Sequence, residues 1–227
     1  MINGSHLDEA SWDQVVKNLK ASNYSVKTVS RWGHDPDKPL HFKQIAENAC
    51  QKINNVSILV AHSFGGALAN EMVGVCPMKI SKIIYIAALV PLDGEHPADQ
   101  LKGSDQKNYM SVVNVTSDRI SPKSQVEFLM TMDADIKSEQ TSLPKVFPEP
   151  LIIQGDVIEF SSAAFNLIPK YYIFTANDKI IPLEWQKKIS QRIKLAGSDT
   201  IQTGHLPSIS NPDKLAEILK SFIQNQK

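Results

Sequence analysis

The feature that most constrains the fold of this chain is a short apolar run that leads directly into a glycine-containing turn. Residues 57–61 read SILVA, and such a run is typical of a strand buried on both faces of a parallel sheet. Residues 65–75 are rich in small and apolar side chains and precede Pro77, which predicts a helix that ends before the proline. A buried strand that passes straight into a helix favours the α/β class.

The turn between this strand and helix carries the sequence AHSFGG at residues 61–66. It approximates G-x-S-x-G, in which a serine lies on a sharp strand-to-helix turn in a strained backbone conformation. The residues two positions before and after the serine pack closely and have to be small, and Ala61 and Gly65 meet that need. The context predicts that Ser63 is a nucleophile. The alternative is a glycine-rich structural turn.

A nucleophilic serine needs a base, and the base needs an acid that fixes its tautomer. Asp178 follows an apolar strand predicted at 170–175, and His205 follows a weak strand at 200–202. Both therefore lie in loops at the carboxyl ends of strands, where open α/β sheets bind ligands. We predict that Ser63, Asp178 and His205 form a catalytic triad, with Asp93 as the competing acid.

The other histidines are weaker candidates for the base. His62 neighbours the serine, but adjacent side chains at such a turn are expected to diverge. The remaining four histidines precede the acid or lie outside strand ends, which favours surface or loop roles: His6, His34, His41 and His96. Of these, His6 and His96 are also placed where they could line the cleft.

The rest of the chain alternates helices with strands, which predicts a mostly parallel sheet with helices on both faces. Apolar residues at helical spacing predict helices at 11–22, 42–53 and 211–223. Short apolar or alternating runs predict strands at 24–29 and 82–90. Ser11 and Gln14 are predicted to form a capping box. Asn211 and Pro212 suit the start of the last helix.

Residues 91–167 interrupt this alternation. They are rich in Pro, Ser, Asp and Lys and contain one convincing helix, near 122–132. A long segment of this kind inside an α/β domain is typical of a lid. We therefore predict an α/β core formed by residues 1–90 and 168–227, with an inserted helical lid at 91–167.

Composition excludes several classes of protein. Of the 227 residues, 24 are Lys or Arg and 24 are Asp or Glu, so the charge indicates neither nucleic acid nor an anionic membrane as a partner. No run reaches about 18 apolar residues, the length of a membrane-spanning helix. The amino terminus lacks the basic and apolar regions of a signal peptide. We expect a cytoplasmic protein, and a homodimer remains open.

Two cysteines, Cys50 and Cys76, are too few for a disulfide scaffold or a cysteine-based zinc site. We expect both to be small buried hydrophobic residues in a reducing compartment. No metal site and no cofactor are predicted.

The chain resembles the α/β-hydrolase superfamily, and within it the hydroxynitrile lyase and plant methylesterase-like group with its bacterial esterase relatives. That group begins with a strand followed by H-G-x(6)-W-x-W. Here Asn3 and Gly4 stand at H-G, and Trp12 stands at the second Trp. The nucleophile, acid and histidine segments match as well, and residues 143–150 resemble the end of that group's cap.

The resemblance implies an oxyanion hole formed by the backbone N–H groups of Phe64 and Ser5. It also implies a strand of about six residues before H-G, but only Met1 and Ile2 precede Asn3, so the first strand is missing or shortened, or another segment fills its place. The lyases of the group carry Thr at the position of Gly4 and Lys at that of Leu206, so this chain lacks the groups that assist cyanohydrin cleavage.

The resulting expectation is a serine hydrolase that cleaves small carboxylic esters through an acyl-enzyme. Apolar residues of the lid are expected to form the substrate pocket or the lid's own core: Phe128, Leu129, Met132, Phe147, Phe160 and Phe165. The first alternative is a binding protein of the same fold with weak or no turnover. The second is cofactor-free chemistry of another kind, such as lyase or dioxygenase activity.

Overall fold

The computed structural model describes residues 1–29, 38–137 and 143–225. Within them, four parallel strands form a central sheet in the order β1-β2-β6-β7. The strands are β1 (Ser57–His62), β2 (Ile80–Ile86), β6 (Lys170–Thr175) and β7 (Gly197–Ile201). The α/β class and the parallel sheet predicted from the sequence are confirmed.

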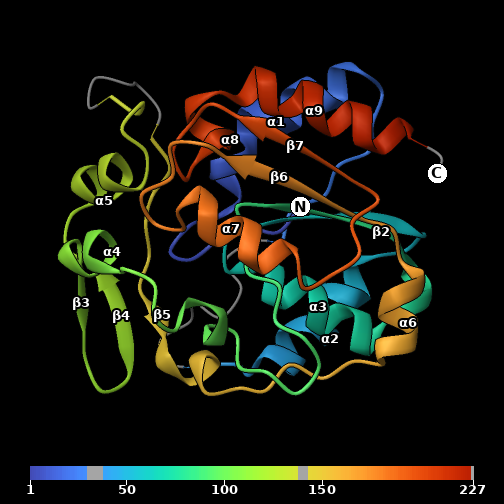
Figure 1. Ribbon diagram of the computed structural model, residues 1–227, viewed down its shortest axis with the longest axis horizontal. Helices are drawn as coiled ribbons and strands as arrows, with labels where there is room; N and C mark the ends of the chain where they lie inside the picture. Colours follow the sequence, from blue (N-terminus) through green and yellow to red (C-terminus); the bar gives the residue numbers. More distant parts are fainter. Residues whose placement is uncertain (30–37, 138–142, 226–227) are drawn as a thin grey trace.

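Helices cover both faces of this sheet (Figure 1). One face packs against α1 (Asp13–Ala21) and α9 (Pro212–Gln224), and the other against α2 (Phe42–Lys52) and α3 (Gly65–Val75). Alternate residues of each strand point to opposite faces, and in the middle of β1 and β2 both sets are apolar. Val60 and Ile84 join the first core, whereas Leu59 and Ile83 join the second.

Several predicted boundaries shift for local reasons. The strand expected at 82–90 ends at Ile86, because Ala87 adopts a left-handed conformation with φ 42°. The capping box of Ser11 and Gln14 is wrong: Asp8 caps a 3-10 turn at Glu9–Trp12, and the Ser11 hydroxyl donates to the Asp8 carbonyl at 2.7 Å. The start of the last helix is confirmed, with the Asn211 side chain accepting from the backbone of Lys214.

The first strand is shortened to a single paired residue. Ile2 bridges Ala61 of β1 on one side and Val29 on the other, both in parallel. The Ile2 N–H donates to the Val60 carbonyl at 2.8 Å, and the His62 N–H donates to the Ile2 carbonyl at 3.1 Å. The strand expected at 24–29 is likewise reduced to the bridge at Val29.

The insertion is not purely helical, which corrects the sequence prediction. It contains the short helices α4 (Lys107–Ser111) and α5 (Gln125–Met132) and an antiparallel sheet in the order β3-β4-β5. Its strands are Val113–Val115, Arg119–Pro122 and Glu149–Pro150. Strands of two to four residues are too short to produce an alternating pattern that sequence analysis detects. Figure 1 shows this lid beside the parallel sheet.

Short 3-10 turns are formed by Pro77–Lys79, Asp99–Leu101 and Leu151–Gln154, and three further α-helices are described, of which the first ends the segment predicted as the lid. These helices are α6 (Ser162–Leu167), which packs on α3, α7 (Leu183–Ser190), which packs on β6, and α8 (Pro207–Ser210), which leads into α9. No helix among the described residues has the length and apolar character needed to cross a membrane.

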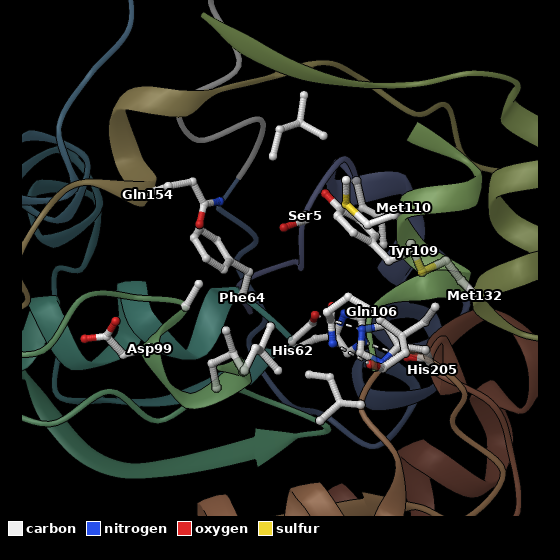
Figure 2. Close-up of a pocket in the computed structure, with 18 of the residues that line it drawn as sticks. Ser5, His62, Phe64, Asp99, Gln106, Tyr109, Met110, Met132, Gln154 and His205 are labelled. Carbon is white, nitrogen blue, oxygen red and sulfur yellow. Dashed lines mark hydrogen bonds between the residues drawn. The ribbon is translucent and has the colours of Figure 1, made fainter. Parts of the chain in front are cut away.

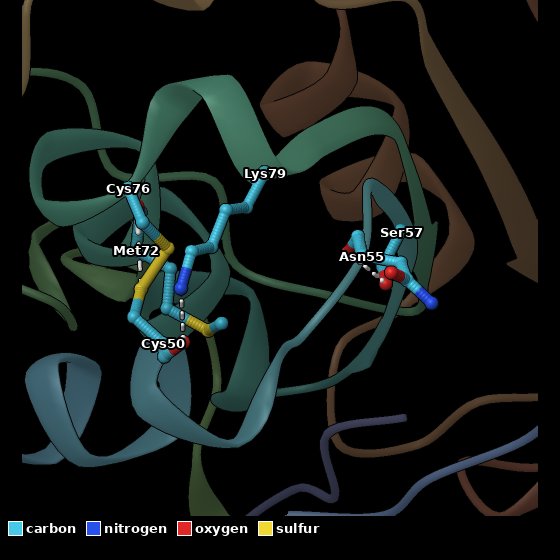
Figure 3. The surroundings of a disulfide bond; sticks show 6 residues. All are labelled: Cys50, Asn55, Ser57, Met72, Cys76 and Lys79. Atoms are coloured by element: carbon cyan, nitrogen blue, oxygen red, sulfur yellow. Dashed lines mark hydrogen bonds between the residues drawn. A yellow bond between two sulfur atoms is a disulfide. The ribbon is translucent and has the colours of Figure 1, made fainter.

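Cys50 and Cys76 form a disulfide, so the expectation of free thiols is wrong (Figure 3). The bond joins the carboxyl end of α2 to the residue that follows α3, and Lys79 donates to the Cys50 carbonyl beside it at 3.1 Å. Sequence spacing alone did not show that two packed helices end side by side. The expectation of a reducing compartment rested on free thiols, and the disulfide removes that support. A cytoplasmic location stays a prediction.

Removal of this disulfide is expected to destabilise the core. The bond closes a loop with a sequence separation of 26 residues, and a cross-link of that span restricts the unfolded chain by about 3 kcal/mol. The double variant C50A/C76A is therefore expected to unfold at a lower urea concentration, with a somewhat higher m-value because its unfolded chain is less compact. Wild-type protein in reducing buffer is the parallel sample. Equal midpoints for wild type and variant would contradict the prediction.

Candidate active site

Ser63 lies at the sharp turn between β1 and α3. Its backbone has φ 54°, in the left-handed region that a residue with a Cβ adopts only under strain. The Ser63 N–H donates to the Ile86 carbonyl, and the Leu89 N–H donates to the Ser63 carbonyl, both at 3.0 Å. These bonds to the segment around the end of β2 hold the serine in its strained conformation.

The glycines of the motif are required by close backbone approach. A Cβ on Gly65 would lie 2.5 Å from the carbonyl oxygen of Asn3, and one on Gly66 would lie 2.0 Å from that of Leu89. Both are backbone atoms, which cannot shift as easily as the end of a flexible side chain. The first turn of α3 therefore packs directly on the amino-terminal segment and on the loop after β2.

The structure brings the three predicted triad residues together. The Ser63 hydroxyl lies 2.8 Å from Nε2 of His205, and Nδ1 of His205 lies 2.7 Å from Oδ2 of Asp178. A carboxylate only accepts hydrogen bonds, so Nδ1 carries the proton and Nε2 is left to accept from the serine. The His205 and Asp178 side chains are almost fully buried.

Asp178 is held in place by donors on both carboxylate oxygens. Oδ1 accepts from the N–H groups of Ile180 and Ile181 at 2.7 and 2.9 Å. Oδ2 accepts from the Thr175 hydroxyl at 2.9 Å as well as from His205. With these partners, the carboxylate that orients the imidazole is itself fixed.

Gln186 also holds Asp178 in place, and the sequence analysis did not identify it. Its buried amide donates to Oδ2 of Asp178 at 3.2 Å and to the Ile181 carbonyl at 2.7 Å, and its carbonyl accepts from the Thr175 N–H. The available signal was a polar residue on the apolar face of α7, three positions before the buried Ile189.

Asp93, the competing acid, does not contact the histidine in any hydrogen bond of the structure. Its Oδ1 accepts from the Phe160 N–H at 2.9 Å. It lines a separate cleft with Glu71 and Glu159. The geometry therefore selects Asp178.

The His62 side chain contacts the backbone of His205, the histidine of the predicted triad. Its Nε2 lies 2.7 Å from the carbonyl oxygen of His205, and the two rings are 4.9 Å apart. A carbonyl only accepts, so Nε2 of His62 carries a proton. Burial, reinforced by the neighbouring His205, lowers the pKa of His62 to about 3. The ring is therefore neutral at neutral pH.

The buried His62 predicts a loss of stability in acid. Its pKa falls from the ordinary 6.5 to about 3 on folding, so below pH 6.5 the unfolded chain binds a proton that the folded chain does not. This contribution is complete above pH 6.5 and is lost toward pH 3, at up to about 1.4 kcal/mol per pH unit. Urea denaturation from pH 4 to 8 measures it. His62→Gln is expected to show a shallower acid slope than wild type, and parallel slopes would contradict the assignment.

The other described histidines lie outside regular strands and the middle of helices, and of the two that were expected to line the cleft His96 does so and His6 does not. His6 is buried and links the amino-terminal loop to the lid, with Nδ1 2.8 Å from the Phe147 carbonyl and Nε2 2.8 Å from the Tyr109 hydroxyl. His96 lines the cavity described next, whereas His41 pairs with Asp156 at 2.6 Å. His34 lies outside the described residues.

A cavity of about 650 Å³ opens on Ser63 and His205 between the core and the lid (Figure 2). Its lining is mostly apolar and includes Phe128 and Met132, as predicted. Leu129 and Phe147 are not among the lining residues, which corrects the prediction. Leu129 is fully buried in the core.

Two other aromatic residues proposed for the pocket belong to the core. Phe160 and Phe165 pack against each other with their ring centroids 4.6 Å apart, and neither lines the cavity. Phe165 lies on α6, which packs against α3.

The residues expected to form the oxyanion hole both line the cavity near the serine. Phe64 is the N-cap of α3, so its backbone lies at the positive end of that helix. Ser5 lies in the loop after the shortened first strand, and a Cβ on the neighbouring Gly4 would lie 2.8 Å from Cβ of Ser63. The described residues contain no cluster of three or more His, Cys, Asp or Glu side chains arranged to hold a metal ion.

Comparisons with known proteins agree with this architecture. The model of the "Alpha/beta hydrolase family" matches residues 1–218. The chain is 27% identical to a putative chloroplastic methylesterase 13 of Arabidopsis thaliana over 89% of its own length and 47% of that relative's, so it spans about half of that protein. It is 22% identical to polyneuridine aldehyde esterase of Rauvolfia serpentina, covering 96% of this chain and 92% of the relative.

Solved structures show the same fold. A pyrethroid hydrolase from Sphingobium faniae superposes with a TM-score of 0.87 at 20% identity, covering 99% of this chain and 96% of that one. Polyneuridine aldehyde esterase superposes with a TM-score of 0.83 at 19% identity, covering 98% of each chain.

Proposed function

This chain belongs to the α/β-hydrolase family, and on that premise we propose that it is a serine esterase that cleaves small carboxylic esters. The observation that carries the proposal is the chain of hydrogen bonds from Ser63 through His205 to Asp178, which begins in an apolar cavity. The relatives named above as esterases or hydrolases support the reaction class.

The reaction would begin with proton transfer from the Ser63 hydroxyl to Nε2 of His205 as Oγ attacks the ester carbonyl carbon. The carbonyl π electrons move to oxygen, and the N–H groups of Phe64 and Ser5 would stabilise the resulting oxyanion. When the intermediate collapses, the alcohol leaves with the proton from His205 and Ser63 remains acylated. Asp178 stabilises the imidazolium between these steps.

Water would complete the cycle. His205, neutral again, removes a proton from a water molecule that attacks the acyl carbon, and a second tetrahedral intermediate forms. Its collapse releases the carboxylic acid and returns the proton to Ser63. Every proton in the cycle passes through Nε2 of His205, and no cofactor is required.

The lining of the cavity supports an uncharged ester with an apolar group as substrate. The apolar lining includes Leu7, Phe128 and Met132. The cation Lys102 also lines the cavity, but its ammonium is paired with Asp99 at 2.6 Å. Binding of an apolar substrate group to this lining is favourable because it buries apolar surface. A charged substrate group would find few partners there to offset the cost of its desolvation.

Lyase chemistry has less support. The position after His205 is Leu206, which is buried and apolar, and Gly4 has no hydroxyl to offer beside the serine. An esterase needs only the triad and the oxyanion donors.

Hydrolysis of p-nitrophenyl butyrate together with labelling by a fluorophosphonate tests the proposal. Wild-type protein is expected to release p-nitrophenol and to gain one covalent adduct, which maps to Ser63. Ser63→Ala is expected to do neither above background. Equal hydrolysis by the two proteins would overturn the proposal. A ligand that raises the melting temperature without turnover or labelling would instead favour the binding protein.

A further inference from the structure

The end of lid helix α5 contacts the loop that carries His205. The N–H of His205 donates to the Met132 carbonyl at 2.9 Å, and the N–H of Leu206 donates to Oδ2 of Asp133 at 3.2 Å. The Ser210 hydroxyl donates to the same Asp133 oxygen at 2.7 Å. Two successive residues of the lid therefore hold two successive residues of the histidine loop.

Asp133 is a buried carboxylate that the proposed reaction does not use. Only 1% of its surface is exposed, and a buried charge is costly unless hydrogen bonds compensate it. Its Oδ1 accepts from the Asp135 N–H at 3.1 Å, while Oδ2 accepts from Leu206 and Ser210. Hydrogen bonds to an ionised acceptor are stronger than neutral ones, so this carboxylate is a firm anchor for the loop.

Gly204 shows how tightly the two segments meet. A Cβ at this position would lie 2.7 Å from Cγ of Asp133 and 2.8 Å from its Cα. The backbone of the histidine loop therefore rests directly on the residue that ends α5, with no space for a side chain between them.

The His205 backbone is consequently held on both sides. The lid accepts from its N–H, and His62 donates to its carbonyl. Asp178 fixes only the ring, by one hydrogen bond at Nδ1. The 2.8 Å contact between Nε2 and Ser63 thus depends on where the backbone is anchored as well as on the triad acid.

We propose that Asp133 is a positioning residue through which lid helix α5 sets the place of His205 relative to Ser63. This inference rests on the proposed esterase mechanism. The same helix presents Phe128 and Met132 to the cavity, and Figure 2 shows Met132 beside His205. One helix therefore shapes the substrate pocket and anchors the base that acts in it.

The test compares Asp133→Ala with Asp133→Asn. The alanine variant leaves Leu206 and Ser210 without their acceptor, so His205 is expected to lose its fixed position, and kcat for p-nitrophenyl butyrate to fall roughly 10- to 100-fold. KM is expected to change by less than about threefold, because the pocket wall stays in place. The asparagine variant retains an amide oxygen for the same donors and is expected to recover most of kcat.

The matched control is Asp135→Ala, because Asp135 is exposed and contributes only its backbone N–H to Asp133. Its kcat is expected to equal that of wild type. The downfield proton resonance of the His205–Asp178 hydrogen bond is the second readout. It is expected to broaden or vanish in Asp133→Ala and to persist in Asp133→Asn and Asp135→Ala.

The proposal is overturned if folded Asp133→Ala keeps both the wild-type kcat and the resonance, or if Asp133→Asn is as impaired as Asp133→Ala. If the alanine variant does not fold, Ser210→Ala takes its place, because it removes one donor to Asp133 and keeps the carboxylate. A weakened His205–Asp178 resonance in Ser210→Ala supports the proposal, and an unchanged resonance overturns it. The resonance needs no substrate. A wild-type protein without ester turnover would therefore refute the proposed function, while the variants still decide the role of Asp133.

Discussion

Replacement of His205 by alanine is expected to lower kcat for p-nitrophenyl butyrate by roughly 10⁶-fold, the loss typical of removing the base of a serine triad. Nε2 of His205 is the atom 2.8 Å from the Ser63 hydroxyl, and every proton transfer of the proposed cycle passes through it. The alanine variant leaves Ser63 as an ordinary hydroxyl. Steady-state kinetics measure the change, and a thermal melt confirms that the variant is folded.

His96→Ala is the matched control for this experiment. His96 also lines the cavity, but its Nδ1 is bonded to the Asp156 carbonyl at 2.9 Å. Its removal is expected to alter KM more than kcat, since it can contact substrate but has no bond to Ser63. If His205→Ala kept kcat within about tenfold of wild type, a difference of only about 1.4 kcal/mol in the barrier, His205 would not be the base.

Asp178→Asn is expected to preserve the fold and lower kcat by roughly 10⁴-fold. An amide can present an N–H to Nδ1, which favours the tautomer with its proton on Nε2, and that tautomer cannot accept from Ser63. Asparagine also cannot stabilise the imidazolium as a carboxylate does. The measurement is kcat beside the urea midpoint, because the N–H groups of Ile180 and Ile181 keep an acceptor in the variant.

The corresponding change at the competing acid separates the two assignments. Asp93→Asn removes a carboxylate that accepts from Phe160 in a different cleft, and kcat is expected to stay within a factor of about two, well under the tenfold that corresponds to 1.4 kcal/mol. Loss of activity in Asp93→Asn with retention in Asp178→Asn would reverse the acid assignment. Retention in both would exclude the triad mechanism.

Local patterns identified the parts of the site that depend on nearby residues. The apolar strand before Ser63 and the small residues around it predicted a strained turn, and Ser63 has φ 54°. Asp178 and His205 were placed by the strands that precede them, because parallel strands bring their carboxyl ends to one edge. The fold class, the parallel sheet and the helices on both faces follow from the same short-range periodicity.

The lid was predicted less well because its elements are short. Strands of two to four residues carry too few positions to show alternation, so the antiparallel sheet was missed. The same limit applies to the side chains of α5. Phe128 and Leu129 are adjacent, similar in character and both buried in the core, yet of the two only Phe128 also lines the cavity.

Contacts between distant segments were decided by the tertiary structure alone. The Cys50–Cys76 disulfide forms because α2 and α3 end side by side. Gln186 reaches Asp178 from α7 across eight positions of sequence, and His62 reaches His205 across 143. No periodicity encodes such pairings.

Apolar periodicity and local backbone sterics were enough to predict the class of fold, the strained turn at Ser63 and the edge of the sheet where Asp178 and His205 lie. Only the three-dimensional structure shows which carboxylate contacts His205, which lid residues face the cavity and how the histidine loop contacts Asp133. These depend on packing between segments far apart in the chain, where leaving one buried polar group unsatisfied costs about 1–3 kcal/mol but no local pattern marks its partner.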